Sequence, residues 1–226
     1  MRAVRDLLSP QSLTEPDEPG PARRRRQRVI VTTLVVGTAV LGATLAAPRG
    51  SLAFTLLGFL VAGVWLAGSA MAGPVPPGPS RGTPRDVMVA VVLGGVAFGA
   101  FVAASLVARR IPALDGAVDS VLSKAQAGPT ALVLVIAIVN AVAEEIFFRG
   151  ALLTALPSAT VGIRRAALVT AVYILVTAAS LNVALVLAAG VMGTLLMIER
   201  LATGGTLAPA LTHVTWSILM ILAFPT

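Results

Sequence analysis

The stretch 140–150, Asn-Ala-Val-Ala-Glu-Glu-Ile-Phe-Phe-Arg-Gly, places two adjacent carboxylates and a guanidinium in apolar surroundings. An ionised side chain inside a membrane helix costs at least ~2.5–3.5 kcal/mol, so such residues are rare and usually functional. Arg149 follows Glu145 by four residues, which puts both on one helix face and lets them pair. Glu144 points about 100° away, shares a face with Asn140, and has no partner in its own helix. The spacing predicts a structural Glu145–Arg149 pair and a Glu144 carboxylate that is free for chemistry.

The candidate partner of Glu144 is His213, the only histidine of the chain, early in the last apolar run. Counted along the helices, Glu144 lies about 12 Å and His213 about 10 Å below the same membrane surface. A carboxylate and an imidazole in one buried aqueous pocket are the minimum needed to activate a water molecule. Asn140, one turn before Glu144, is the predicted polar neighbour of Glu144 in that pocket. A helix-end carboxylate and an ordinary buried histidine remain the alternative interpretation.

The composition indicates what surrounds these residues. The chain has 226 residues, of which 57% are hydrophobic and 12% charged, whereas soluble domains are about 45–50% apolar and about 25% charged. Apolar runs near the length of about 20 residues needed to span a bilayer recur along the chain. They predict an all-α, polytopic membrane bundle of about seven transmembrane helices, at 29–47, 52–72, 87–108, 130–156, 166–181, 182–198 and 206–224.

The pattern along the chain predicts three parts. Residues 1–28 are rich in proline and arginine, cannot bury enough apolar surface, and are expected to form a disordered, basic cytoplasmic tail. Residues 29–129 are expected to hold the N-terminal helices, including a polar connection at 109–129. Residues 130–226 are expected to form the core that carries the site. Within that core a 33-residue apolar stretch is interrupted at residues 180–182, which predicts two helices folded back on each other.

The cations indicate topology. With the N-terminus in the cytoplasm, thirteen Lys and Arg residues lie inside and four outside, as expected from the positive-inside rule. The cations fall between apolar runs and not on one folded face, so no nucleic-acid partner is expected. Arginine replaces lysine almost throughout a chain rich in Ala, Gly and Pro, which points to a bacterial plasma membrane. The chain has no cysteine, which excludes disulfides and thiolate zinc sites.

At these residues the chain resembles the CPBP family of intramembrane metalloproteases, which includes CAAX-type prenyl-protein endopeptidases, bacteriocin-processing proteins and abortive-infection proteins. The first family motif, E-E-x-x-x-R, is matched by Glu144, Glu145 and Arg149. The third motif, H-x-x-x-N/D, usually follows a Gly-x-Leu-x-Pro-x-Leu-x-His approach, which residues 205–213 reproduce. The resemblance covers about residues 130–224.

The second motif, F-x-x-x-H, is where the chain departs from the family. The best alignment puts Tyr173 at the phenylalanine and Thr177 at the histidine, and Ser217 falls at the Asn/Asp of the third motif. In the family, the first glutamate and the two histidines are taken to hold or activate the attacking water. Carried over residue by residue, this implies Glu144 as general base and His213 as ligand or base. It implies Thr177 and Ser217 as hydrogen-bonding members of the same polar pocket.

The resemblance implies an intramembrane endopeptidase that cuts a membrane-associated protein or peptide, including a lipid-modified one, near the cytoplasmic face. It also implies zinc, for which Glu144 and His213 are the candidate ligands. Catalytic zinc normally has three protein ligands, so a metal-free dyad of these two residues is the competing possibility. The alternative function is a catalytically inactive, CPBP-like membrane scaffold or immunity protein.

Overall fold

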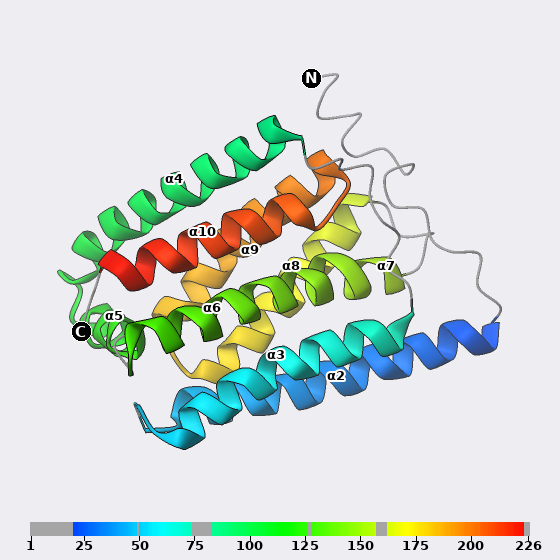
Figure 1. Ribbon diagram of the computed structural model, residues 1–226, viewed down its shortest axis with the longest axis horizontal. Coiled ribbons are helices and arrows are strands. Elements are labelled where there is room, and N and C mark those ends of the chain that lie inside the picture. The colour runs from blue at the N-terminus through cyan, green and yellow to red at the C-terminus, as the bar shows by residue number, and fades with distance from the viewer. Residues whose placement is uncertain (1–19, 49, 74–82, 126–127, 157–161, 224–226) are drawn as a thin grey trace.

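A computed structural model describes residues 20–48, 50–73, 83–125, 128–156 and 162–223. The described chain is an all-α bundle whose long helices run side by side, with the connections gathered at the two ends (Figure 1). The helices are α2 (Gly20–Ala46), α3 (Leu52–Ala72), α4 (Pro84–Ala108), α5 (Pro112–Ala125), α6 (Thr130–Glu144), η2 (Glu145–Leu152), α7 (Leu153–Ala155), α8 (Gly162–Thr177), η3 (Ala178–Ser180), α9 (Val183–Thr203) and α10 (Leu207–Ala223).

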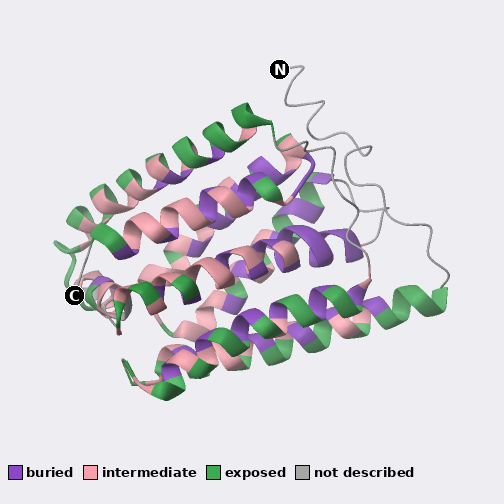
Figure 2. Ribbon diagram, viewed as in Figure 1, coloured by how far each residue is buried: buried purple, intermediate pink, exposed green. Residues whose placement is uncertain are grey.

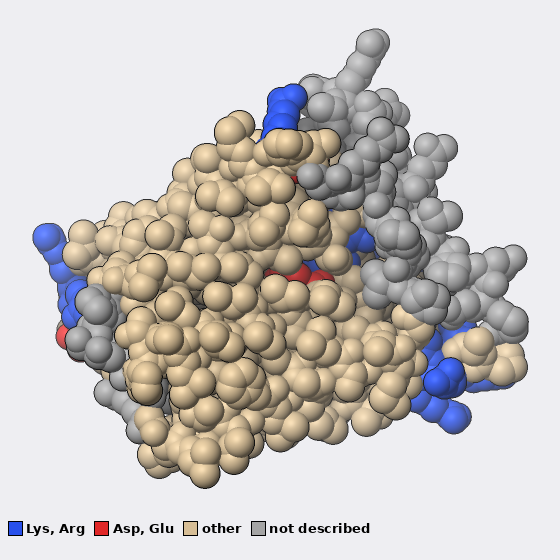
Figure 3. Space-filling view, in the orientation of Figure 1, with Lys and Arg blue, Asp and Glu red and all other residues tan. Residues whose placement is uncertain are grey.

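Six helical segments of the described chain are long and apolar enough to cross a membrane, and α10 is a shorter apolar helix. They correspond to the seven predicted runs, and the protein is a multi-pass membrane protein. Large apolar side chains such as Val35 and Leu175 are exposed on the outside of the bundle, where a lipid environment would cover them. Lys and Arg lie mainly toward the ends of the bundle, on either side of a broad band of other residues (Figure 3).

The predicted break between the fifth and sixth apolar runs is confirmed. After α8 and the short η3, Leu181 adopts a left-handed conformation (φ 51°), and this reverses the chain. The side chain of Asn182 then accepts a hydrogen bond from the backbone N–H of Leu185 (3.1 Å) and caps the N-terminus of α9. As a result α8 and α9 pack against each other as a helical hairpin.

Helix α2 begins at Gly20, inside the segment that the sequence predicts to be a disordered tail. Its first turns carry the arginine run, and one of these arginines explains why the helix extends so far. Arg26 is buried, and its Nε donates a hydrogen bond to the carbonyl of Ala72 at the end of α3 (2.9 Å). The rest of the predicted tail, residues 1–19, lies outside the described residues, and the predicted division at residues 29 and 130 stays a prediction.

The predicted polar connection at 109–129 contains the helix α5. Arg109, at the end of α4, pairs with Asp119 (2.7 Å) and contacts Asp115 (3.6 Å). Val118 and Leu122 of the same helix line an apolar cavity. The sequence predicts a polar connection here because the apolar residues of this helix are too few to span a bilayer.

Buried residues concentrate at the end of α6 and through η2 and α7 (Figure 2). Trp65 of α3 packs on Phe147 and Phe148 of η2, with ring centroids 4.8 and 5.2 Å apart. Helix α2 approaches α3 closely, because a Cβ at Gly37 would lie 2.2 Å from the indole of Trp65. The charged motif is therefore held on the best-packed segment of the bundle.

Candidate active site

The charged motif lies where the fourth membrane span changes from an α-helix to a π-helix. Helix α6 ends at Glu144, and Glu145–Leu152 form an eight-residue π-helix. Segments of π-helix are rare and are found frequently at functional sites, because the wider turn redirects the side chains. Every residue of this segment except Ile146 is buried. Glu145 and Arg149 are both fully buried, with no exposed surface.

Glu145 is the centre of the buried network. Its Oε1 accepts a hydrogen bond from Nη1 of Arg149 (3.0 Å), which forms the predicted ion pair. The same oxygen lies 3.0 Å from Nδ1 of His213, which reaches it from α10. The sequence predicts that Glu144 and His213 act together through a water molecule, and it did not predict this direct contact between His213 and Glu145. Glu145 thus joins the first and third motifs through one oxygen atom.

Arg149 is fixed by groups from other helices as well. Its Nη2 donates to the carbonyl of Gly193 on α9 (3.1 Å), and its guanidinium lies 4.6 Å from the ring centroid of Tyr173 on α8. Its own backbone carbonyl accepts a hydrogen bond from Nε of Arg200, near the end of α9 (2.8 Å). A buried charge needs such compensation, because an unpaired charge in a low-dielectric interior is strongly disfavoured. These contacts tie η2 to α8 and α9.

Glu144 points to a different place. Its Oε2 accepts a hydrogen bond from the hydroxyl of Tyr173 (3.0 Å), and the residue is half-buried. Glu144 and His213 line one cavity of about 200 Å³, together with Tyr173, Thr177 and Trp216. The cavity has room for water and has polar groups on two sides, which is what an internal water site requires. The prediction that Glu144 and His213 share a pocket agrees with this placement.

Of the other candidate site residues, one lines the cavity and two do not. Thr177 lines the cavity, and its hydroxyl donates to the carbonyl of Tyr173 one turn earlier (2.9 Å). Asn140 does not line the cavity, because its amide group donates to the carbonyls of Gly58 (2.9 Å) and Ile136 (2.8 Å). Asn140 therefore joins α6 to α3. Ser217 is buried but does not line the cavity either.

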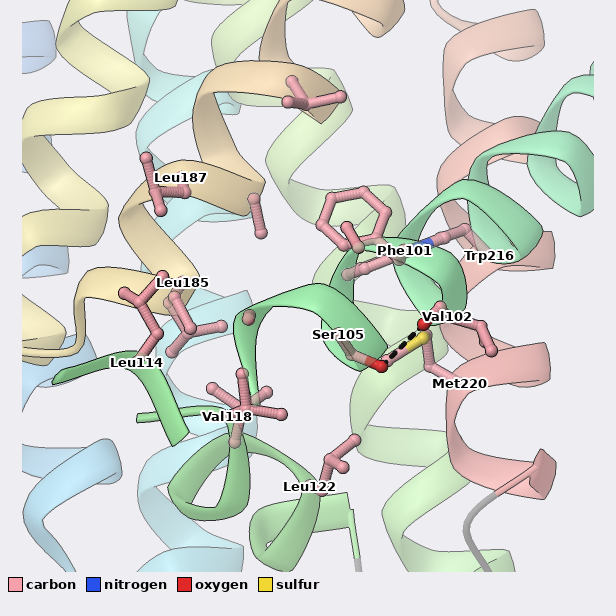
Figure 4. Close-up of a pocket in the computed structure, with 16 residues that line it drawn as sticks. Phe101, Val102, Ser105, Leu114, Val118, Leu122, Leu185, Leu187, Trp216 and Met220 are labelled. Atoms are coloured by element: carbon pink, nitrogen blue, oxygen red, sulfur yellow. Dashed lines mark hydrogen bonds between the residues drawn. The ribbon is translucent and has the colours of Figure 1, made fainter. Parts of the chain in front are cut away.

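A second cavity lies against the first and is almost entirely apolar (Figure 4). It also holds about 200 Å³ and lies between α4, α5, α9 and α10. Leu185, Ala188 and Trp216 line both cavities, so these three side chains form the shared wall. Ser105 is the polar side chain of the lining besides the indole, and its hydroxyl is bonded within its own helix to the carbonyl of Val102 (2.7 Å). The second cavity therefore suits an apolar group.

The residues around the first cavity do not fit a three-ligand zinc centre. Glu144 and His213 supply two donors of the right type, but the neighbouring Thr177 supplies only a neutral hydroxyl. Glu145, the remaining carboxylate, already has Oε1 engaged by Arg149 and His213. Among the described residues there is no group of three His, Cys, Asp or Glu side chains that could hold a metal. The donor set is one ligand short.

Three residues of the network were missed from the sequence. Tyr173 was not predicted as a member of the site, although its position four residues before Thr177 places it on the same helical face. Glu199 and Arg200 were not predicted as members of the site either. Both are buried: Glu199 accepts a hydrogen bond from the hydroxyl of Thr212 (2.9 Å), and Arg200 bonds the carbonyl of Arg149. The sequence signal that could have identified Glu199 and Arg200 is a pair of adjacent, opposite charges directly after a long apolar run.

The fold and the site together define the class of protein. It is a multi-pass helical membrane protein in which a carboxylate, a guanidinium and an imidazole form a buried network beside a cavity. Residues 126–219 match the type II CAAX prenyl endopeptidase Rce1-like family. This segment contains both glutamates, Arg149, Tyr173 and His213, and it agrees with the resemblance seen in the motifs. No curated protein and no solved structure was found to match the chain.

Proposed function

We propose that the protein is an intramembrane endopeptidase, in which Glu144 and His213 activate a water molecule to hydrolyse a peptide bond of a membrane-associated protein or peptide. The observation that carries the proposal is the shared cavity of about 200 Å³, which is lined by a carboxylate from α6 and an imidazole from α10. General acid–base catalysis by positioned groups of this kind contributes about 10²–10⁴-fold to a rate. The family of residues 126–219 supports the same reaction class.

In this reaction Glu144 accepts a proton from the water while the water oxygen bonds to the carbonyl carbon of the substrate. The carbonyl π electrons move to its oxygen, and a tetrahedral intermediate forms. The protonated Glu144 then gives the proton to the amide nitrogen as the C–N bond breaks. The products are a new carboxyl terminus and a new amine, so one water molecule is consumed and Glu144 returns to its ionised form.

His213 would orient the water. An ionised Glu145 accepts at Oε1, so Nδ1 of His213 carries the ring proton and Nε2 keeps its lone pair. Nε2 is then able to accept one hydrogen bond from the water while Glu144 accepts the other. A carboxylate behind an imidazole fixes the tautomer and the orientation of the ring, as in other hydrolases. Glu145 and Arg149 thereby support catalysis without touching the substrate.

The apolar cavity beside the site supports a substrate with an apolar portion. Because Leu185, Ala188 and Trp216 separate the two cavities, a group in the apolar cavity would lie next to the bond that is cut. An apolar segment of a membrane peptide or the lipid group of a modified protein has the required chemistry. With the N-terminus in the cytoplasm, the site lies toward the cytoplasmic face, and the bilayer is the protein's other partner.

No step of this proposal passes through a metal ion, because the donors found around the cavity fall one short of a catalytic zinc site. Glu144 and His213 are the side chains that would ligate zinc if a third ligand came from the substrate or water.

The second candidate function is a catalytically inactive membrane scaffold or immunity protein of the same family. The observation that favours it is Thr177, which lines the cavity at the position of the family's second histidine. In that case the cavity would bind a partner segment without cutting it. Glu144→Gln would then leave the biological function intact, whereas changes at Glu145 or Arg149 would destroy the fold.

The experiment that tests the proposal compares cleavage of membrane-embedded substrates by the parent protein, Glu144→Gln and His213→Ala. Both variants are expected to lose activity by at least about 100-fold. Glu199→Gln is the matched control, since it makes the same isosteric change in another buried glutamate, outside the cavity lining. Full activity in both site variants would show that the proposed site is wrong.

A further inference from the structure

The ring of Tyr173 is fixed from three sides. The guanidinium of Arg149 lies 4.6 Å from its centroid, and Phe148 meets it edge-on with centroids 5.0 Å apart. On the third side is Gly193, where an added Cβ would lie only 3.0 Å from Cδ1 of Tyr173. Such packing leaves the ring little freedom, so its hydroxyl is held at one place.

That place is the carboxylate of Glu144. The hydroxyl donates to Oε2 at 3.0 Å, which occupies one oxygen of the carboxylate and leaves Oε1 for another partner. A carboxylate with both oxygens unbound rotates freely about its last bond. One fixed hydrogen bond from a rigid donor removes that freedom. It also stabilises the ionised carboxylate, since hydrogen bonds to charged groups are stronger than neutral ones.

The same stretch of α8 shows why this contact matters in this chain. Thr177, one turn after Tyr173, lines the cavity but bonds its own backbone, so it does not hold Glu144. In the aligned motif of the resembling family these positions carry phenylalanine and histidine. In this chain Tyr173 stands where the family motif has the apolar phenylalanine. It is the hydroxyl of Tyr173 that bonds the carboxylate of Glu144.

We propose that Tyr173 is a positioning residue for the hydrolysis, which holds Glu144 with Oε1 available to receive the proton of the attacking water. The inference rests on the proposed function, since it assigns Tyr173 its role through Glu144. The hydroxyl does not itself enter the reaction. It fixes the orientation of the Glu144 carboxylate. The contacts of the Tyr173 ring with Arg149 and Gly193 hold that ring, and therefore its hydroxyl, in one position at the cavity.

The test is Tyr173→Phe, which removes one oxygen and keeps the ring contacts. We expect kcat for a membrane-embedded peptide substrate to fall about 10–100-fold, which corresponds to the loss of one hydrogen bond to a charged group. KM and the unfolding temperature are expected to stay as in the parent protein. Thr194→Val is the matched control, because it removes a hydroxyl that bonds the carbonyl of Gly190 in its own helix (2.7 Å) and lines neither cavity, and it is expected to keep the parent kcat.

A spectroscopic measurement separates the contact from the reaction. Tyr173 is the only tyrosine of the chain, so the tyrosine doublet in the Raman spectrum reports this hydroxyl without labelling. We expect the doublet of the parent protein to show a strong donor, and Glu144→Gln to weaken that signature. Thr194→Val is expected to leave the doublet unchanged.

A Tyr173→Phe variant with the parent kcat, or with a raised KM and an unchanged kcat, would overturn the inference while the proposed function stands. Parent activity that survives in Glu144→Gln would instead overturn the proposed function and, with it, the positioning role. A parent Raman doublet without donor character would refute the hydrogen bond itself, whatever the activity.

Discussion

His213 and Glu145 meet at a single oxygen: Nδ1 of the imidazole lies 3.0 Å from Oε1 of a glutamate that is 68 residues away in the chain. Glu145 has no exposed surface and also accepts a hydrogen bond from Arg149. The buried pair thus fixes the position of α10 against η2. It also orients the ring of His213, which bonds Glu145 and at the same time lines the cavity shared with Glu144.

The Glu145–Arg149 pair is expected to be needed for folding. Arg149→Leu leaves the buried Glu145 without its cation, and breaking a buried ion pair on one side costs about 3–5 kcal/mol. We expect a loss of that size in the free energy of unfolding, measured by thermal or denaturant unfolding in detergent. The replacement of both partners, Glu145→Gln with Arg149→Met, is expected to recover part of the loss because no unpaired charge remains.

Arg109→Leu is the control for this prediction. Arg109 also pairs with a carboxylate, at 2.7 Å from Asp119, but both side chains are largely exposed. Exposed ion pairs contribute about 0.2–1 kcal/mol, so the variant is expected to unfold nearly as the parent does. Equal losses for Arg149→Leu and Arg109→Leu would contradict the structural role of the buried pair.

The missing third donor predicts how the protein binds zinc. The parent protein is expected to retain well under one equivalent after purification, since Glu144 and His213 are the only side chains of the usual ligand type among the described residues that line the cavity. Thr177→His adds an imidazole to the same wall and is expected to raise the content to about one equivalent. Elemental analysis of the purified proteins is the measurement.

Thr177→Val serves as the control for the added imidazole and is expected to bind no more zinc than the parent. A parent protein with one tightly held equivalent that is lost in Glu144→Gln would contradict this prediction. It would mean that a further donor reaches the metal.

The membrane orientation is predicted to place the N-terminus in the cytoplasm. Because the chain has no cysteine, single cysteines report accessibility directly. Gly20, at the start of α2, and Gly116, in α5, both have open space around an added Cβ. An impermeant thiol reagent added to intact cells is expected to label Gly116→Cys and not Gly20→Cys. Lysed cells, in which both should react, are the control, and the reverse pattern would invert the topology.

Much of the fold followed from the sequence because long apolar runs and charged breaks are strong signals in a membrane protein. The runs predicted the spans, and residues 180–182 predicted the reversal between α8 and α9. The helix α5 and the early start of α2 were not predicted. Both depend on tertiary contacts, such as the bond from Arg26 to the carbonyl of Ala72, which periodicity does not reveal.

Glu144, His213 and Thr177 line one cavity, and Glu145 pairs with Arg149 at the four-residue spacing that the sequence shows. The roles of these residues stay predictions. The direct contact between His213 and Glu145 was not predicted. The prediction assumed a regular α-helix, whereas residues 145–152 form a π-helix in which side-chain directions differ from the regular 100° steps.

The roles of Tyr173 and Asn140 could not be read from the sequence for a related reason. A tyrosine in an apolar helix is more often a packing residue, and only the three-dimensional approach of α8 to α6 brings its hydroxyl to Glu144. Asn140 shares a helical face with Glu144, but α3 comes close enough to take its amide through the carbonyl of Gly58. Long-range packing decided both cases.

The most direct test of the central claim, that Glu144 activates water to cut a peptide bond, is isotope incorporation. Membranes that contain the parent protein, Glu144→Gln or the control Glu199→Gln are incubated in oxygen-18 water, and new carboxyl termini are identified by mass spectrometry. We predict termini carrying the heavy oxygen with the parent and the control, and their loss with Glu144→Gln. The same labelled termini in the Glu144→Gln membranes would contradict the claim.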